Sequence, residues 1–315
     1  MPNQENAQPK KPKLLITGGL GFIFSHVTEY FVAKGWEVVV LDNLSAGSHP
    51  EILDGSFKHI DLDVSKREVI GKIIEEAPDY VIHAAAYSDV DGSIKMPEVI
   101  FFNNAVSTLW VFEACRLMPQ LKRLIYVSTD EVYGECEHRK REDEIIFPRN
   151  PYSLSKAVGS LMRLAYDNTY KDLHDKTSET RFCNVFGPRQ DTRKIIPAIK
   201  HALDTDTPLP VHNDGKGYRE YIYIKEIPPV IEKILLDTRE GRTFNVTANY
   251  GYTVEQLILM AVDITGKQIT AVPSERSGMD VKYQMSNERL HNTFEWQPQY
   301  TFKEAFAAYL AGKPL

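Results

Sequence analysis

A glycine-rich turn between an apolar run and a helical pattern constrains the fold of this chain more than any other feature. The turn follows the run Lys13–Thr17 and contains Gly18 and Gly21. Gly18 permits a tight turn, and Gly21 lets an anion approach the first amides of the next helix, where the helix dipole favours negative charge. A strand, a glycine turn and a helix in this order predict a dinucleotide-binding α/β unit.

The first half of the chain continues this alternation of strands and helices. Further strands are expected at Glu37–Leu41, Tyr80–His83, 124–128 and 179–183, and helices at 22–34, 101–118 and 152–170. Such alternation gives right-handed crossovers and a parallel sheet that is covered on both faces. We therefore predict an α/β fold in which residues 13–188 form a Rossmann-like, doubly wound parallel sheet.

The pattern of expected secondary structure changes after Pro188. Helices expected at 195–203, 227–236, Val254–Thr265 and Phe302–Leu310 are separated by short strands and turn residues. Residues 189–315 are therefore predicted to form mainly a smaller C-terminal α/β lobe that binds substrate. Residues 1–12 are polar and rich in proline and lysine, and are expected to be a disordered tail.

Charge and composition restrict the partners. The net charge of −6 argues against a nucleic-acid binder, which needs a basic surface. No stretch approaches the ~20 apolar residues that span a bilayer. The three cysteines, Cys115, Cys136 and Cys183, have no metal-ligand spacing. We therefore expect no metal, no membrane and a reducing, cytoplasmic location.

An acidic residue at the end of the second strand indicates the cofactor. Asp42 follows the glycine turn by about twenty residues, where a carboxylate accepts hydrogen bonds from ribose hydroxyls and repels a 2′-phosphate. This favours NAD over NADP. The expected cofactor pocket also takes in residues beside the turn and after two strands, namely Phe22, Ile23, Asn43, Ala84 and Ala85.

Phe24 stands where the third glycine of the turn motif is expected. A small residue there allows the helix to pack closely on the strand. Either the helix is displaced outward, or Phe24 turns away from the sheet.

Tyr152 and Lys156 are candidate catalytic residues because they lie four residues apart and share one face of a helix. A nearby lysine ammonium lowers the pKa of a tyrosine and makes its phenolate available as a base. The same spacing recurs at Tyr30/Lys34, Tyr221/Lys225 and Tyr309/Lys313. Tyr152 is selected by Ser128-Thr129, which ends a parallel strand at the edge where a nicotinamide is expected.

Two consecutive acids follow that strand end. Asp130 and Glu131 are placed to supply one general acid and one general base. A bare acidic pair is otherwise typical of a solvated turn or a helix cap.

The segments STDEVYG (128–134) and NPYSLSK (150–156) resemble those of extended short-chain dehydrogenases/reductases, and in particular NDP-glucose 4,6-dehydratases of the dTDP-glucose type. The resemblance covers nearly the whole chain. It implies that Tyr152, with Lys156 and Thr129, removes the O4 proton while hydride passes from C4 to NAD. It assigns removal of the C5 proton to Glu131 and protonation of the departing C6 hydroxyl to Asp130, before hydride returns to C6.

The resemblance also implies binding residues and an assembly. Asp61 and Leu62 fall where the family holds adenine. A second group falls at positions where the family binds the nucleotide-diphosphate sugar, namely Ser88, Asn184, Lys194, Arg219, Asn245 and Arg276. A homodimer with a four-helix interface is expected, and the helices at 101–118 and 152–170 carry apolar residues on more than one face.

Two stretches depart from the family and leave the nucleotide and hexose open. Residues 88–93 read SDVDGS where the family has SHVDRS, and residues 276–282 read RSGMDVK in place of a more basic stretch. A 4-epimerase or a dehydratase forming a 5,6-ene therefore remains an alternative on the same fold. A non-catalytic, nucleotide-binding regulator is a third possibility, suggested by Phe24 and the altered loops.

Overall fold

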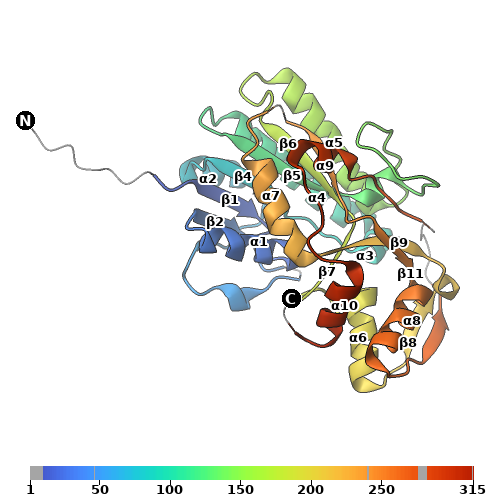
Figure 1. Cartoon of the computed structure of the whole chain (residues 1–315). Helices are drawn as coiled ribbons and strands as arrows, with labels where there is room; N and C mark the ends of the chain where they lie inside the picture. The colour runs from blue at the N-terminus through green and yellow to red at the C-terminus, as the bar shows by residue number, and fades with distance from the viewer. Residues whose placement is uncertain (1–9, 46, 240, 276–281, 314) are drawn as a thin grey trace, which may run out of the picture.

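A seven-stranded parallel sheet forms the centre of the protein (Figure 1). The structure is a computed structural model that describes residues 10–45, 47–239, 241–275, 282–313 and 315. In space the strands are β10 (Thr243–Val246), β6 (Thr177–Phe182), β5 (Arg123–Thr129), β4 (Tyr80–His83), β1 (Lys13–Thr17), β2 (Glu37–Leu41) and β3 (Lys58–Ile60). The order reverses between β1 and β4, which confirms the doubly wound topology and creates a crevice at the carboxyl ends of these strands.

Helices cover both faces of the sheet (Figure 1). On one face, α4 (Pro97–Arg116) packs against α2 (Val69–Glu76) and α5 (Pro151–Thr169). On the other, α1 (Phe22–Ala33) packs against α7 (Ile227–Leu235). Each face has its own apolar cluster, as expected for a parallel sheet whose strands are buried on both sides.

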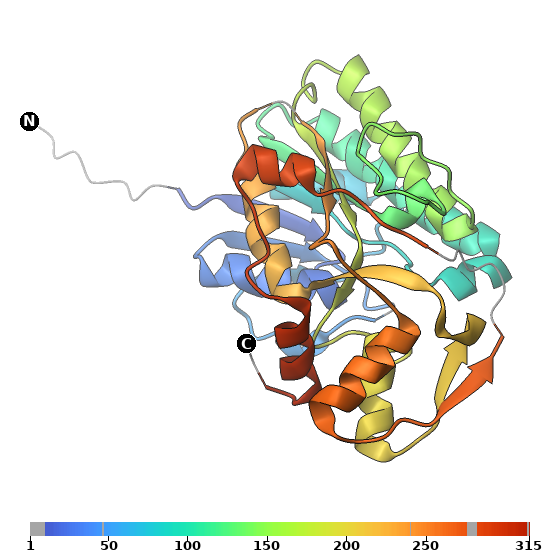
Figure 2. The same cartoon turned by 45° about the vertical axis from the view of Figure 1, so that its right-hand side comes forward.

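The smaller lobe lies beyond the carboxyl edge of the sheet (Figures 1 and 2). A three-stranded sheet joins it to the main body, because β9 pairs with β11 and with β7, which follows β6 directly. The bounds are β7 (Asn184–Phe186), β8 (Leu209–His212), β9 (Tyr218–Tyr223), β11 (Tyr250–Thr253), β12 (Ala271–Ser274), α6 (Ile195–Thr205), α8 (Val254–Thr265) and α10 (Phe302–Leu310).

The second half of the chain contributes to both units. Strand β10 pairs with β6 at the end of the large sheet, and α7 packs on the same body. The chain also returns there as α9 (Glu288–Phe294), which contacts β10. Residues 189–315 are therefore divided between the sheet and the smaller lobe.

Several predicted boundaries differ from the observed ones, most clearly those of α4 and β6. Helix α4 begins at Pro97 rather than at 101, because proline fits the first helical turn, where its missing N–H is not needed. Strand β6 begins at Thr177, two residues before the prediction. Short elements complete the fold, namely α3 (Val90–Lys95) and the 3₁₀ turns η1 (Pro50–Ile52), η2 (Asp130–Tyr133), η3 (Asn213–Gly215) and η4 (Ile224–Glu226).

Phe24 is buried in the core rather than turned away from the sheet. Its side chain is 4% exposed, and its ring lies 6.5 Å from that of Phe182, the last residue of β6, at an interplanar angle of 62°. An aromatic contact between α1 and β6 thus occupies the position of the expected third glycine.

Two features are absent from the described part of the chain. None of its helices has the length and apolarity needed to cross a membrane. No cluster of three or more His, Cys, Asp or Glu side chains in the same part could hold a metal ion.

Candidate active site

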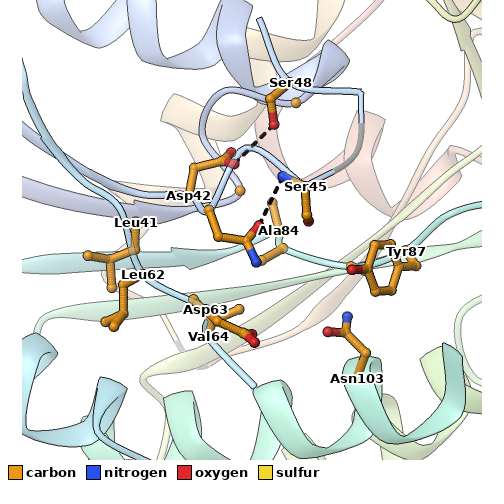
Figure 3. Close-up of a pocket in the computed structure, with 15 residues that line it drawn as sticks. Leu41, Asp42, Ser45, Ser48, Leu62, Asp63, Val64, Ala84, Tyr87 and Asn103 are labelled. Carbon is orange, nitrogen blue, oxygen red and sulfur yellow. Dashed lines mark hydrogen bonds between the residues drawn. The ribbon is translucent and has the colours of Figure 1, made fainter. Parts of the chain in front are cut away.

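A pocket opens at the switch point between β1 and β4 (Figure 3). Its lining comes from the glycine turn, the ends of β2 and β4, the segment after β3, and α4. The lining residues are Gly18, Gly21, Leu41, Asp42, Asn43, Ser45, Ser48, Leu62, Asp63, Val64, Ala84, Ala85, Ala86, Tyr87 and Asn103. The predicted cofactor residues Gly18, Gly21, Asp42, Asn43, Leu62, Ala84 and Ala85 therefore lie together, and Phe22 and Ile23 begin the adjoining helix.

The glycine turn is shaped to let a bulky anion approach the backbone. Gly18 has a φ of +70°, and a Cβ there would lie 2.7 Å from backbone atoms of Ala85. Gly21 caps α1 and has no side chain that could accept a hydrogen bond from the first helical amides, so these amides are open to another acceptor. This cradle fits the diphosphate of a dinucleotide.

Asp42 is held firmly at the mouth of this pocket. One carboxylate oxygen accepts a hydrogen bond from the backbone N–H of Leu20 at 3.0 Å, within the glycine turn. The other accepts from the N–H of Leu44 at 2.9 Å and from the hydroxyl of Ser48 at 3.0 Å, as Figure 3 shows for Ser48. Its fixed negative charge lies where a ribose carrying a 2′-phosphate would be repelled.

Asp42→Asn should lower the ratio of the affinity for NAD to the affinity for NADP by roughly tenfold, equivalent to about 1.4 kcal/mol. The substitution removes the repelling charge and keeps the size of the side chain. Fluorescence or calorimetric titration of both cofactors against both proteins measures this ratio. Equal affinity of the wild-type protein for NAD and NADP would contradict the role given to Asp42.

The far side of the pocket differs in detail from the prediction. Leu62 lines it, as expected, but Asp61 is exposed and Asp63 takes part instead. Ser45 and Ser48 were not predicted, because no sequence motif marks the loop after β2. In Figure 3, Leu41 and Leu62 lie at one end of the pocket and Tyr87 and Asn103 at the other.

Asn104 connects the Tyr87 end of the pocket to α5. Its side chain accepts a hydrogen bond from the N–H of Tyr87 at 2.8 Å and donates to the carbonyl of Tyr87 at 3.0 Å. It also donates to the hydroxyl of Ser155 at 2.9 Å. Ser155 directly precedes Lys156, so the pocket and the tyrosine–lysine helix are fixed relative to each other.

Thr129 and the two acids form a tight turn at the end of β5. The hydroxyl of Thr129 donates to Asp130 at 3.1 Å and accepts from the backbone N–H of Glu131 at 3.3 Å. Asp130 is 5% exposed, and its Oδ2 atom is buried without a hydrogen-bond partner among the described residues. Burial is the main cause that raises the pKa of Asp130 to about 7, and the neighbouring Glu131 adds to it.

Helix α5 brings Tyr152 and Lys156 to this turn. Asn150 and Ser153 form a capping box, and Pro151 occupies the first helical position, so the helix begins immediately before Tyr152. Gly159 lets the helix lie close to β5, since a Cβ there would be 2.1 Å from the hydroxyl oxygen of Tyr126.

Burial changes the expected state of Tyr152. Desolvation raises its pKa above the ordinary range, and the charges of Glu131 and Asp130 raise it further, whereas a hydrogen bond with Thr129 acts in the opposite direction. The prediction that Lys156 lowers the pKa of Tyr152 is therefore wrong for this state of the protein, because burial and two carboxylates dominate. The same contacts show that Thr129, Asp130, Glu131 and Tyr152 form one cluster.

Lys156 is 4% exposed, and its ammonium lies 4.6 Å from the centroid of the Tyr126 ring. Burial lowers its pKa to about 7, and the buried carboxylate of Glu179 opposes this shift. Glu179 is itself paired with Arg181 at 2.8 Å, and it accepts a hydrogen bond from Ser160 at 2.6 Å. This buried acid beneath α5 was not recognised in the sequence, where it lies within a strand pattern.

The predicted substrate-binding residues differ in their contacts and in their exposure. Arg219, on β9, acts electrostatically on Asp130 and stacks on the ring of Tyr283 at 4.4 Å. Asn184 begins β7 and donates to the carbonyl of Glu220 at 3.3 Å. Lys194 caps α6 and, like Ser88, is exposed.

Asn245 is fully buried, and its hydrogen bonds are made within the protein. Its amide nitrogen donates to the carbonyls of Lys140 and Ser286, and its oxygen accepts from the hydroxyl of Tyr133. This arrangement favours a structural role over direct contact with substrate. Arg276 lies outside the described residues.

By its fold and by the pocket at its switch point, the protein is an NAD-dependent enzyme built on the extended short-chain dehydrogenase/reductase plan. It belongs to the NAD dependent epimerase/dehydratase family, whose sequence profile matches residues 14–247.

Relatives of more than one kind share this family. The low-salt glycan biosynthesis protein Agl12 of Haloferax volcanii is 33% identical over 307 residues, which cover 94% of this chain and 96% of that protein. A dTDP-glucose 4,6-dehydratase of Xanthomonas campestris is 32% identical over 320 residues, with 93% and 90% covered. The structure of Thermus thermophilus UDP-glucose 4-epimerase in complex with NAD superimposes with a TM-score of 0.87 at 28% identity, covering 95% of this chain and 98% of the epimerase.

Proposed function

We propose that the protein is a nucleotide-sugar 4,6-dehydratase, which converts an NDP-hexose into an NDP-4-keto-6-deoxyhexose. The observation that carries this proposal is the state of Asp130, a buried carboxyl that has a pKa of about 7 and one oxygen without a hydrogen-bond partner in the described part of the chain. Such a group is protonated in a large fraction of molecules at neutral pH and has an atom free to donate a proton. A 4-epimerase does not need this acid, because it expels no water.

The base for oxidation at C4 is assigned to Tyr152 on α5. When bound, NAD supplies the acceptor for hydride from C4 and the donor that returns it to C6. In its phenolate form, Tyr152 takes the proton from O4, and the hydroxyl of Thr129 orients its phenol oxygen. Protonation of Asp130 removes one of the two negative charges that oppose loss of the proton from Tyr152. The acid form of Asp130 therefore favours this step as well as the next.

Elimination is assigned to the acidic pair. The new ketone at C4 acidifies the C5–H bond, and Glu131 removes that proton as a general base. Asp130 protonates the hydroxyl at C6, which leaves as water. The proton held by Glu131 is returned to C5 when hydride is returned to C6. Two adjacent carboxyls in different protonation states provide this combination of acid and base.

The relatives support a nucleotide-diphosphate hexose as substrate but leave the reaction open between two classes. Both a 4,6-dehydratase and a 4-epimerase are among them. Incubation with a panel of NDP-hexoses, followed by mass spectrometry, distinguishes these classes. A 4,6-dehydratase gives a product lighter by one water that carries a 4-ketone, and an epimerase gives unchanged mass. Loss of water without the ketone would indicate 5,6-dehydration.

We further propose a homodimer built on α4 and α5. Five large apolar side chains of these helices remain exposed in the single chain, namely Val99, Phe102, Leu154, Leu161 and Leu164. Exposed apolar residues on two helices that pack side by side are typical of an interaction surface. Val111 and Phe112, on another face of α4, are buried in the core.

Leu161→Glu should convert the dimer into monomers at micromolar concentration, because it places a charge within the proposed apolar interface. Leu161 is 57% exposed in the single chain, so the substitution spares the core. Leu259→Glu, at a position 62% exposed on α8, is the matched control and should remain dimeric. Light scattering measures both, and a monomeric wild-type protein would overturn the proposal.

A cytoplasmic location is part of the same proposal. It is supported by Cys115, Cys136 and Cys183, which are all buried and free of disulfide bonds.

A further inference from the structure

Asn150 connects the start of α5 to the acidic pair. Its side-chain oxygen accepts a hydrogen bond from the backbone N–H of Ser153 at 2.8 Å, which caps the helix. Its side-chain nitrogen donates to Oε2 of Glu131 at 3.0 Å. Asn150 is 8% exposed, so both bonds are made in a nearly dry environment, where they are stronger than in water.

The two neighbouring acids therefore have different surroundings. Glu131 receives a neutral amide donor, and a donor of this kind stabilises a carboxylate and not a carboxylic acid. Among the described residues, Asp130 receives a hydrogen bond from the hydroxyl of Thr129 alone, at Oδ1, and its buried Oδ2 has no partner. Desolvation without a donor favours the protonated carboxyl.

We propose that Asn150 is a positioning residue that makes Glu131, rather than Asp130, the base of the acidic pair. Its amide keeps the carboxylate of Glu131 ionised and holds it against the first turn of α5, next to Tyr152. The catalytic role of this contact rests on the proposed dehydration, whereas the effect of Asn150 on the ionisation of Glu131 does not.

Other charged and titratable groups face the pair from the elements around it. Asp130 adjoins Glu131 on η2, and Tyr152 faces both acids from α5. Arg219 and Glu220, on β9, act on Asp130 with opposite signs. Asn150 is itself uncharged, so its substitution changes the hydrogen bond to Glu131 without removing a charge from this set.

Two substitutions distinguish the helix-capping role of Asn150 from its hydrogen bond to Glu131. Asn150→Ser and Asn150→Asp both retain good N-cap residues, so α5 should still form and the proteins should still fold. Serine lacks the amide donor, and aspartate replaces it with a negative charge. Thermal unfolding followed by circular dichroism checks that both variants are folded.

The decisive measurement needs no substrate. Glutamate labelled with ¹³C at the side-chain carboxyl is incorporated into the full chain, and Glu131→Gln identifies the resonance of Glu131. We expect the midpoint of its pH titration to move upward by about 1 pH unit in Asn150→Ser, the scale of a hydrogen bond to a charged group, and further in Asn150→Asp. Loss of a hydrogen bond of this strength would move the midpoint by more than about 0.3 pH units. If the midpoint stays within about 0.3 pH units of wild type in both folded variants, Asn150 only caps the helix and the inference is wrong.

Activity then tests the catalytic consequence. In an enzyme that dehydrates its sugar nucleotide, the acid limb of the dehydration rate should shift upward by the same amount, because Glu131 must be ionised to accept the C5 proton. A titration shift without any shift of this limb would overturn the assignment of Glu131 as the base. Failure of the wild-type protein to dehydrate any hexose would instead overturn the proposed function, while the carboxyl titration would still decide the role of Asn150.

Discussion

Tyr152→Phe should abolish both reduction of the nicotinamide and formation of the dehydrated sugar. Without the phenol oxygen the O4 proton has no acceptor, so no ketone forms and C5–H is not acidified. Loss of general-base assistance costs about 10²–10⁴-fold, and this loss applies to every later step. Stopped-flow absorbance of the reduced nicotinamide measures the oxidation, and mass spectrometry measures the product.

The control for this variant lies on the same helix. Tyr166 donates its hydroxyl to Glu113 at 2.6 Å on the face that packs against α4, away from the acidic pair. Tyr166→Phe removes the same atom and should leave the rate nearly unchanged. Tyr152 is itself buried, and phenylalanine keeps its ring, so the variant should fold and bind NAD. Wild-type turnover by Tyr152→Phe would remove Tyr152 from the mechanism.

Glu131→Gln should separate oxidation from elimination. Removal of the C4 hydrogen does not need this carboxylate, so the variant should still reduce the nicotinamide when it binds its sugar nucleotide. Removal of the C5 proton does need it, and release of dehydrated product should therefore fall by about 10²–10⁴-fold. The expected signature in a single turnover is reduced nicotinamide that persists.

A nearby exposed acid provides the comparison. Glu137 lies in the loop after η2, and Glu137→Gln removes the same charge from the protein without touching the pair. It should turn over like wild type. Dehydration by Glu131→Gln at the wild-type rate would mean that the acidic pair is only a capped turn, and the dehydratase proposal would lose its main support.

Local patterns were sufficient to predict the fold class and the position of the pocket. The turn containing Gly18 follows β1 and the acid Asp42 follows the neighbouring strand β2, yet each is recognisable in its own segment. This works because a strand, a tight turn and a helix N-terminus are set by neighbouring residues. The parallel sheet then brings the ends of separate strands to one edge without further specification.

The motif around Thr129 and the pair Tyr152/Lys156 were likewise recognisable, but their electrostatic states were not. Sequence reasoning expected Lys156 to lower the pKa of Tyr152, whereas burial and the acidic pair raise it. The burial of single side chains was not predictable from the sequence either, since Asp61 is exposed and Asn245 is fully buried.

The sequence by itself thus determined the doubly wound sheet, the NAD pocket and the identity of the side chains at the carboxyl edge. Only the tertiary structure decided that β10 forms one edge of the sheet, that Oδ2 of Asp130 is buried without a hydrogen-bond partner among the described residues, and that Asn150 reaches Glu131 across 19 positions of the chain. The physical reason is that turns and helix starts depend on adjacent residues, whereas burial and the charge state of a carboxyl depend on everything that packs around it.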